Sequence, residues 1–177
     1  SISPTSRSVA YGSTTTFTVT PNAGYTASMG GTCGGSLVET TYTTNAITGN
    51  CTVVATFTLN SYAVTASATG NGTITPASQS ITHGATAAFT VTPDTGHEVS
   101  MGGTCGGLLS GNTYTTFGIT AACTVTATFT PINYTVTASA GSGGSISPTS
   151  RSVAYGSTTT FTVTPNAGYT ASVGGTC

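Results

Sequence analysis

The chain repeats itself every 72 residues. Residues 1–33 recur as residues 145–177 with one change, Met29 to Val173, and a third copy lies between them without insertion or deletion. Self-similarity at a fixed period predicts a tandem array of small structural units. We divide the chain into a first repeat (residues 1–59, without its opening strand), a complete middle repeat (60–131) and a third repeat (132–177, without its last third). We expect further copies on both sides.

Apolar residues alternate with Thr and Ser inside each repeat. Cys123, Val125, Ala127 and Phe129, for example, are separated by single threonines. Successive side chains of a strand face opposite sides, so a period of two gives each strand a core face and a threonine face. Turn signals such as the Pro-Asp-Thr-Gly run at 93–96 separate these segments. We predict an all-β fold, with strands in the middle repeat near 62–68, 73–76, 85–93, 97–101, 113–116 and 122–130.

Charge is nearly absent from the chain. Thr and Ser make up over a third of the residues, and the net charge is -1. A chain of this kind has no basic surface for nucleic acid or anionic lipid, so we expect neither as a partner. It also has no apolar stretch near the roughly 20 residues that a membrane helix needs. The only formally charged residues are Arg7, Glu39, Asp94, Glu98 and Arg151.

Five cysteines without metal-type clustering indicate disulfides and an oxidising compartment. Pairing within repeats would join Cys33 to Cys51 and Cys105 to Cys123, and leave Cys177 for a partner beyond the chain. The alternative, Cys51–Cys105 with Cys123–Cys177, would link neighbouring repeats and leave Cys33 unpaired. We expect the first pairing, because it makes each repeat self-contained and stabilises it by roughly 3 kcal/mol in the chain-entropy model.

The middle repeat holds four residues that invite a metal or catalytic interpretation: His83, Asp94, His97 and Glu98. The same positions of the first repeat hold Tyr11, Asn22, Tyr25 and Thr26. The two histidines also flank one predicted strand, which would place them roughly 30 Å apart at about 3.3 Å per residue. We find no nucleophile elbow, phosphate-binding loop or paired carboxylates. We therefore expect no cofactor, no metal and no catalysis.

The repeat resembles the divergent internalin B-repeat family of bacterial surface proteins. The resemblance covers nearly the whole chain and is carried by the opening strand from Tyr134, the Phe161-Thr-Val-Thr-Pro165 segment, the Gly-Tyr pair at 168–169 and the Thr-Ala-Thr-Phe ending at 126–129. The cysteines suggest a cysteine-containing subgroup of this family. The family implies a compact β-grasp-like unit, for which a small antiparallel β-sandwich is our alternative, in secreted or cell-surface stalks and adhesins. The resemblance implies no catalytic residue in this chain.

The spacing between repeats leaves little linker. Only four residues separate Phe57 from Tyr62, and four separate Phe129 from Tyr134. We therefore expect closely stacked repeats in an extracellular or cell-surface stalk. Strand edges are normally guarded by charge, so a chain with so little of it could also associate with itself into fibres. The alternative is an adhesin that binds carbohydrate or another surface through exposed Tyr11, Tyr25 and Tyr42.

Overall fold

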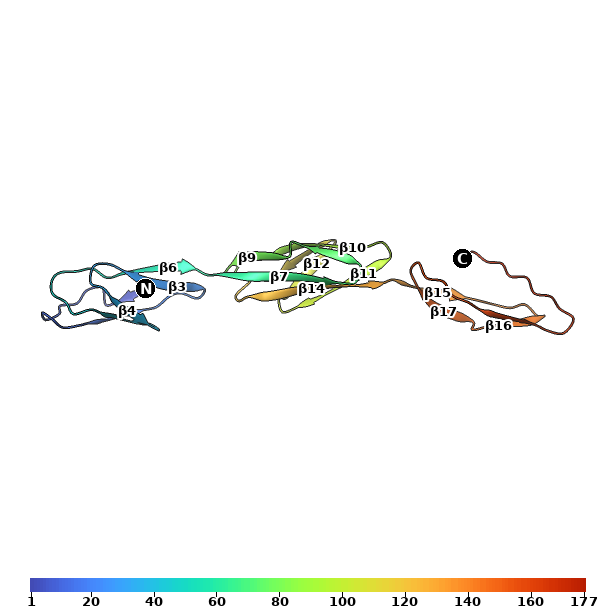
Figure 1. Ribbon diagram of the computed structural model, residues 1–177, viewed down its shortest axis with the longest axis horizontal. Coiled ribbons are helices and arrows are strands. Elements are labelled where there is room, and N and C mark those ends of the chain that lie inside the picture. Colours follow the sequence, from blue (N-terminus) through green and yellow to red (C-terminus); the bar gives the residue numbers. More distant parts are fainter. The chain divides into compact units, whose positions relative to one another are not determined.

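The computed structural model describes residues 1–177 and consists of strands and connecting turns without a helix (Figure 1). The predicted all-β class, with one disulfide in each repeat that holds both cysteines, is confirmed. In chain order the strands are β1 (Ile2–Ser3), β2 (Thr16–Val19), β3 (Tyr25–Gly30), β4 (Gly35–Val38), β5 (Thr41–Thr44), β6 (Val54–Leu59), β7 (Ser61–Thr69), β8 (Gly72–Thr75), β9 (Ser78–Thr82), β10 (Ala88–Pro93), β11 (His97–Gly103), β12 (Gly107–Ser110), β13 (Thr113–Thr116), β14 (Cys123–Pro131), β15 (Asn133–Thr137), β16 (Gly144–Ser147), β17 (Ser150–Ala154) and β18 (Thr162–Pro165).

Contacts group the chain into two compact units. The first contains Ser1–Thr65, Ser78–Ala88 and Thr115–Cys123, and the second contains Ala66–Ala77, Phe89–Tyr114 and Thr124–Cys177. The division passes through the middle repeat. Each connection between consecutive repeats therefore lies within a single unit.

The middle repeat forms two four-stranded sheets, with the strand orders β12-β13-β10-β8 and β11-β14-β7-β9. Within the second unit, β8 packs closely on β14, because a Cβ added to Gly72 would lie 2.7 Å from the ring of Phe129. In this unit a strand of one sheet therefore packs against a strand of the other. Figure 1 shows β7 and β14 running together through this repeat.

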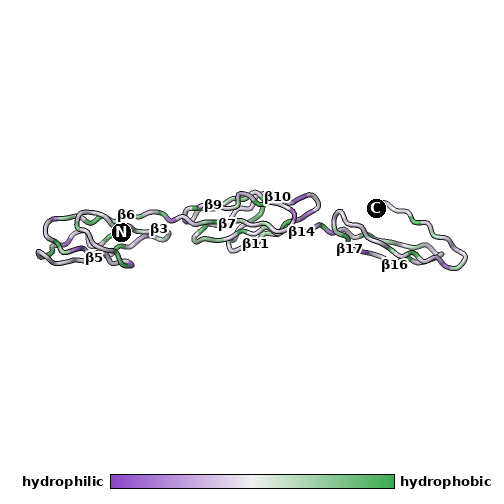
Figure 2. The backbone as a smooth tube through the Cα atoms, in the orientation of Figure 1, coloured by the Kyte–Doolittle hydropathy of each residue, from purple (hydrophilic) through white to green (hydrophobic).

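The alternation of the sequence explains the core. In β14, Val125, Ala127 and Phe129 are at most 3% exposed, whereas Thr124, Thr128 and Thr130 are exposed. Burying side chains the size of valine or phenylalanine supplies about 1.5–3 kcal/mol each. The threonine face covers the other side of each sheet without charge, and Figure 2 accordingly shows few strongly hydrophilic segments along the backbone.

Two threonines depart from this division of faces. Thr44 and Thr116 are 3% and 2% exposed, on the core faces of β5 and β13. Their hydroxyl oxygens accept hydrogen bonds from backbone N–H groups, that of Thr15 at 3.0 Å and that of Ala87 at 2.8 Å. A buried hydroxyl is stable only when it is hydrogen-bonded in this way.

The structure adds two strands to the six predicted for the middle repeat. β9 has the polar sequence Ser-Gln-Ser-Ile-Thr, which lacks the alternation of a half-buried strand, and its pairing with β7 makes it a strand. β12 is a short Gly-Leu-Leu-Ser segment next to β13. Both strands lie at sheet edges, where one paired neighbour is enough and the sequence pattern is weak.

The other two repeats reproduce parts of this architecture. In the first repeat the sheet order is β1-β2-β5-β4, and β3 pairs with β6 in a separate two-stranded sheet. Two antiparallel pairs make up the third repeat, β15 with β17 and β16 with β18. Thus Val91↔Ile74 in the middle repeat has the equivalent pair Ile146↔Val163 in the third.

Disulfide bonds close the repeats internally. Cys33 and Cys51 are joined, with an S–S distance of 2.02 Å and a Cα–Cα distance of 4.9 Å. Cys105 and Cys123 are also disulfide-bonded, and Cys177 is free and exposed, so no other partner is left for either of them. This is the pairing within repeats. In the chain-entropy model, closing a loop of 18 residues stabilises the fold by about 3 kcal/mol.

Candidate functional surfaces

The connection between the first and middle repeats is built on the backbone of Asn60. The Asn60 N–H donates to the carbonyl oxygen of Gly24 at 2.8 Å, and the Asn60 carbonyl oxygen accepts from the N–H of His83 at 2.9 Å. The side chain is also held, because the Thr26 hydroxyl donates to Asn60 Oδ1 at 2.6 Å. One residue thus links a turn of each repeat, and all of these residues belong to the first compact unit.

The next connection uses the equivalent atoms. The Ile132 N–H donates to the carbonyl oxygen of Gly96 at 2.8 Å, and the Ile132 carbonyl oxygen accepts from the N–H of Tyr155 at 2.8 Å. Each position lies 72 residues after its counterpart. Because only backbone atoms are used, the linking residue can change from Asn to Ile without loss of these bonds.

Glycine is required at the turn of both connections. Gly24 and Gly96 have φ angles of +79° and +76°, which side chains of L-residues rarely adopt. A Cβ at Gly24 would also overlap the ring of His83, and one at Gly96 the ring of Tyr155. The connections therefore combine two backbone hydrogen bonds with a ring packed on a glycine. We call these two sets, Gly24–Asn60–His83 and Gly96–Ile132–Tyr155, the junctions.

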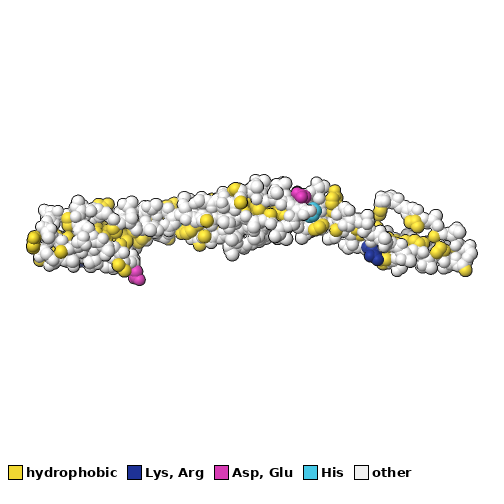
Figure 3. Space-filling model, in the orientation of Figure 1, with side chains coloured by type: hydrophobic (Ala, Val, Ile, Leu, Met, Phe, Trp, Pro, Cys, Tyr) yellow, Lys and Arg dark blue, Asp and Glu magenta, His cyan; other side chains and the backbone are white.

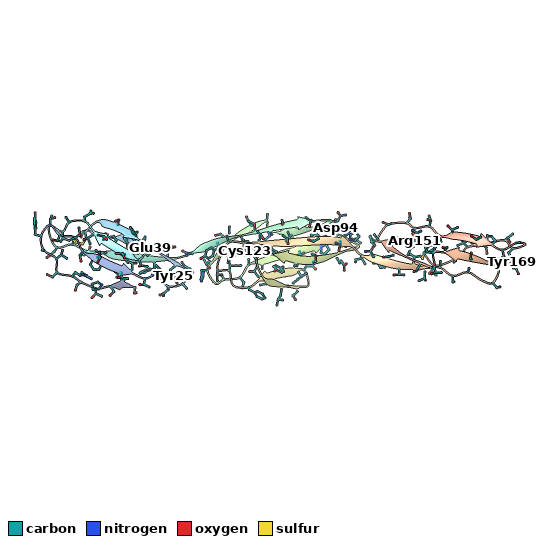
Figure 4. All side chains as sticks on the ribbon, turned by 90° about the horizontal axis from the view of Figure 1, so that it is seen from below. Tyr25, Glu39, Asp94, Cys123, Arg151 and Tyr169 are labelled. Carbon is teal, nitrogen blue, oxygen red and sulfur yellow. A yellow bond between two sulfur atoms is a disulfide. The ribbon has the colours of Figure 1, made fainter.

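The three tyrosines predicted as a binding surface do not share one environment. Tyr11 is 83% exposed and Tyr25 is 39% exposed. Tyr11 occupies the same repeat position as His83 and Tyr155, whose rings pack on the junction glycines. Tyr25 begins β3, and its equivalent Tyr169 is 61% exposed. Figure 4 shows both labelled side chains on the outside of the ribbon.

The prediction that Tyr42 is an exposed binding residue is wrong. Tyr42 is 3% exposed, at a core position of β5, and its equivalent Tyr114 is 4% exposed in β13. The Tyr114 hydroxyl donates to the carbonyl oxygen of Cys105 at 3.0 Å, which satisfies the only polar atom of the side chain inside the core. These tyrosines are core residues.

The residues considered for metal binding or catalysis are dispersed. His83 belongs to a junction, Asp94 lies in a turn, and His97 and Glu98 start β11. The Nδ1 atom of His97 lies 3.3 Å from the carbonyl oxygen of Thr95 in its own turn. The structure contains no group of three or more His, Cys, Asp or Glu side chains placed to hold a metal ion. Nor does it contain a helix of the length and hydropathy that crossing a membrane requires.

Two sheet edges expose apolar side chains without a guarding charge on the strand. β4 and β12 occupy the same edge position in their repeats. Val38 in β4 is 69% exposed, and Leu108 in β12 is 68% exposed. The visible face in Figure 3 carries charged side chains at only a few places. Edges of this kind present unpaired backbone groups to another strand.

Sequence reasoning identified the short spacing between repeats but missed the junction residues themselves. The available signal was the recurrence of glycine at 24 and 96 with an aromatic residue at 83 and 155. Nothing in a single repeat indicates that these two positions meet across the connection.

Comparison with known proteins identifies a repeat family. The sequence model of the divergent InlB B-repeat domain matches residues 1–61, 62–133 and 134–172. The three matches follow one another along almost the entire chain. No curated protein and no solved structure matches it significantly.

Proposed function

Because the chain belongs to the divergent InlB B-repeat family, we propose that it is a non-catalytic structural repeat segment of an extracellular or cell-surface bacterial protein. In this role it separates or displays other parts of the protein as a stalk, and it associates with further copies into fibres. The disulfides support an oxidising location, since such bonds persist mainly outside the cytosol.

The observation that carries the stalk proposal is the recurrence of the junction. Asn60 and Ile132 make the same two backbone hydrogen bonds, although their side chains differ in chemistry. A flexible linker would need no such bonds and would be rich in Gly and Ser. A bonded junction restrains the direction in which one repeat follows another, which is what a spacer requires.

Self-association is supported by the edges of the sheets. Val38 and Leu108 expose apolar surface on β4 and β12, and neither strand carries a charged residue. Natural proteins usually protect such edges with Lys, Pro or a bulge. We therefore place the contact between copies at these edges.

An adhesin that binds carbohydrate is the second candidate. Tyr25 and its equivalent Tyr169 both expose their rings, as a stacking surface for sugar would. Binding to a glycan array that is lost in Tyr25→Ala and Tyr169→Ala would support this function over the structural one. Tyr42→Ala is unsuitable as a test, because that ring is part of the core.

The experiment that tests the structural function is electron microscopy together with sedimentation velocity over a range of protein concentrations. We expect filaments or larger species at high concentration. A protein that stays strictly monomeric at the highest attainable concentration would contradict self-association. NMR relaxation of the amides at 60 and 132 tests the spacer separately: order equal to that of the strands supports it, and linker-like mobility contradicts it.

A further inference from the structure

β12 is a free edge strand in the middle repeat, which the chain contains from its first strand to its last. It ends the sheet order β12-β13-β10-β8, so β13 pairs with one side of it and no strand lies on the other. Leu108 is 68% exposed on the outer face, whereas Leu109 is half-buried. The strand carries no charge. This edge is therefore open whatever lies beyond the ends of the chain, and it exposes apolar surface beside backbone groups.

The first repeat shows which backbone groups of such an edge are free. In the register of β4 and β5, Ser36 lies opposite Thr43, and the Asn45 N–H donates to the Gly34 carbonyl oxygen at 3.3 Å. Hydrogen-bonded residues alternate along an antiparallel pair. Ser36 therefore also bonds β5, whereas Leu37 directs its N–H and C=O away from it.

The middle repeat has the equivalent residues 72 positions later. Leu108 accordingly bonds β13, and its neighbours Gly107 and Leu109 direct their backbone groups away from β13. β12 has no other neighbouring strand, and no turn or loop forms a backbone hydrogen bond with these two residues. Two residues of the edge thus present unpaired N–H and C=O groups to a further strand.

A second β12 strand matches these groups when it runs antiparallel. Opposed residues of an antiparallel pair lie on the same face of the sheet. A twofold axis at Leu108 places Gly107 of each copy opposite Leu109 of the other, where the two residues exchange both of their hydrogen bonds. Leu108 then lies opposite Leu108 in the position between these pairs, where Cα atoms are only about 4.5 Å apart. The edge is therefore complementary to itself.

We propose that β12 pairs with β12 of a second copy of this chain, antiparallel and with Leu108 opposite Leu108. The pairing covers the exposed leucine and brings no charge into the contact. A net charge of -1 means that two copies repel each other only weakly. Such an isologous contact joins copies in pairs. The inference rests on the proposed self-association and assigns its first contact to one edge and one register.

β4 does not offer the same pairing. A twofold axis at Ser36 would place hydroxyl against hydroxyl and leave Val38 outside the centre of the contact. Opposing Val38 with Val38 would instead place Glu39 opposite Leu37 of the second copy. Glu39 has a φ of 53°, which is not extended backbone, and it would bring a charge into the pair. Pairing of β4 with β12 would place Ser36 opposite Leu108.

Cysteine trapping tests the register. Leu108→Cys is made together with Cys177→Ser, because Cys177 is free and exposed. A Cα separation of about 4.5 Å is within the range that a disulfide spans, so mild oxidation should link two copies through position 108. Ser110→Cys in the same background is the matched control, because Ser110 is exposed on the same face of β12. We expect at least tenfold less linked dimer from it, measured by non-reducing electrophoresis and peptide mapping.

Single substitutions test the choice of edge. Leu108→Lys places a charge in the contact, and we expect the concentration at which larger species appear in sedimentation velocity to rise at least tenfold. Leu108→Ser introduces the residue of the first repeat at this position and should raise that concentration at least threefold without added charge. Val38→Lys places the same charge on β4 and should change it by less than twofold.

The outcomes separate this inference from the function on which it rests. Trapping at position 108 together with loss of association in Leu108→Lys supports both. A wild-type chain that forms no larger species overturns both. Association that Val38→Lys suppresses and Leu108→Lys leaves intact overturns the assignment to β12, while self-association stands. Equal trapping of Leu108→Cys and Ser110→Cys overturns the register.

Discussion

The ring of His83 packs directly on Gly24, and the ring of Tyr155 packs on Gly96 in the same way. The contact brings a turn of one repeat against a turn of the next. It stands beside the backbone hydrogen bonds of Asn60 and Ile132, so each junction closes through both polar and apolar interactions. The array is therefore held together at places where the sequence shows only a glycine and an aromatic residue.

Substitution of the junction glycines should open the junctions selectively. In Gly24→Ala and Gly96→Ala the new Cβ overlaps a ring, and this overpacking destabilises the junction by about 1–3 kcal/mol. The positive φ of an alanine at the same position destabilises it by about a further 1–2 kcal/mol. We expect hydrogen-exchange protection of the His83 amide to fall at least tenfold in Gly24→Ala, and that of the Tyr155 amide in Gly96→Ala.

Gly168 is the matched control for these variants. It has the same positive φ, +83°, but a Cβ there would meet nothing within 4 Å. Gly168→Ala should therefore show the backbone cost alone and leave both junction amides protected. Equal effects of all three variants on the His83 and Tyr155 amides would mean that the ring contacts do not close the junctions.

His83→Tyr should strengthen the first junction. The Nδ1 atom of His83 is buried without a hydrogen-bond partner, and an unsatisfied buried polar atom costs about 1–3 kcal/mol. Tyr155 shows that a phenol ring fits the equivalent position with 48% of its surface exposed. We expect about 1 kcal/mol of stabilisation, measured as slower exchange of the amide at position 83. The reciprocal Tyr155→His should weaken the second junction, and a gain there would contradict the explanation.

Glu39→Gly should stabilise the first repeat. Glu39 is the only non-glycine residue with a positive φ, at 53°, and it lies in the turn between β4 and β5 (Figure 4). The middle repeat has Gly111 at the same position with a φ of 55°. A side chain in this region costs about 1–2 kcal/mol, so the substitution should raise the free energy of unfolding in urea by about 1 kcal/mol.

Two further variants separate conformation from charge at this turn. Glu39→Gln keeps the side chain and removes the charge, and we expect it to change stability by less than about 0.5 kcal/mol, as for most surface substitutions. Gly111→Glu should lower the free energy of unfolding by about 1 kcal/mol. A gain from Glu39→Gln as large as that from Glu39→Gly would identify the charge as the cause.

Thr116→Val should destabilise the middle repeat, although it retains size and shape. The variant leaves the buried N–H of Ala87 without the acceptor that it now has at 2.8 Å, at a cost of about 1–3 kcal/mol. Thr115→Val, at an exposed position of the same strand, is the control and should change stability by less than about 0.5 kcal/mol. Urea unfolding measures both, and similar values would show that the buried hydroxyl is dispensable.

The sequence predicts the strands of the core well, because Val125, Ala127 and Phe129 alternate with threonine and a buried face requires that period. It does not distinguish a core tyrosine from a surface one: Tyr42 is flanked by threonines and Tyr25 by Gly24 and Thr26, and neither setting shows which of the two rings is buried. Edge strands such as β9 are also missed, because pairing with β7, and not the local pattern, makes them strands. The junction contacts depend on residues far apart in the chain.

Lysine on the exposed edges should suppress self-association. Val38→Lys combined with Leu108→Lys places a charge on β4 and on β12, where an added strand would have to bury it. We expect the concentration at which larger species appear in sedimentation velocity to rise at least tenfold. Phe117→Lys is the matched control, because Phe117 is 61% exposed in a segment outside the strands. Equal suppression of association by this control would mean that the added charge or the lost apolar surface prevents association. Pairing of strand edges would then not be what holds the copies together.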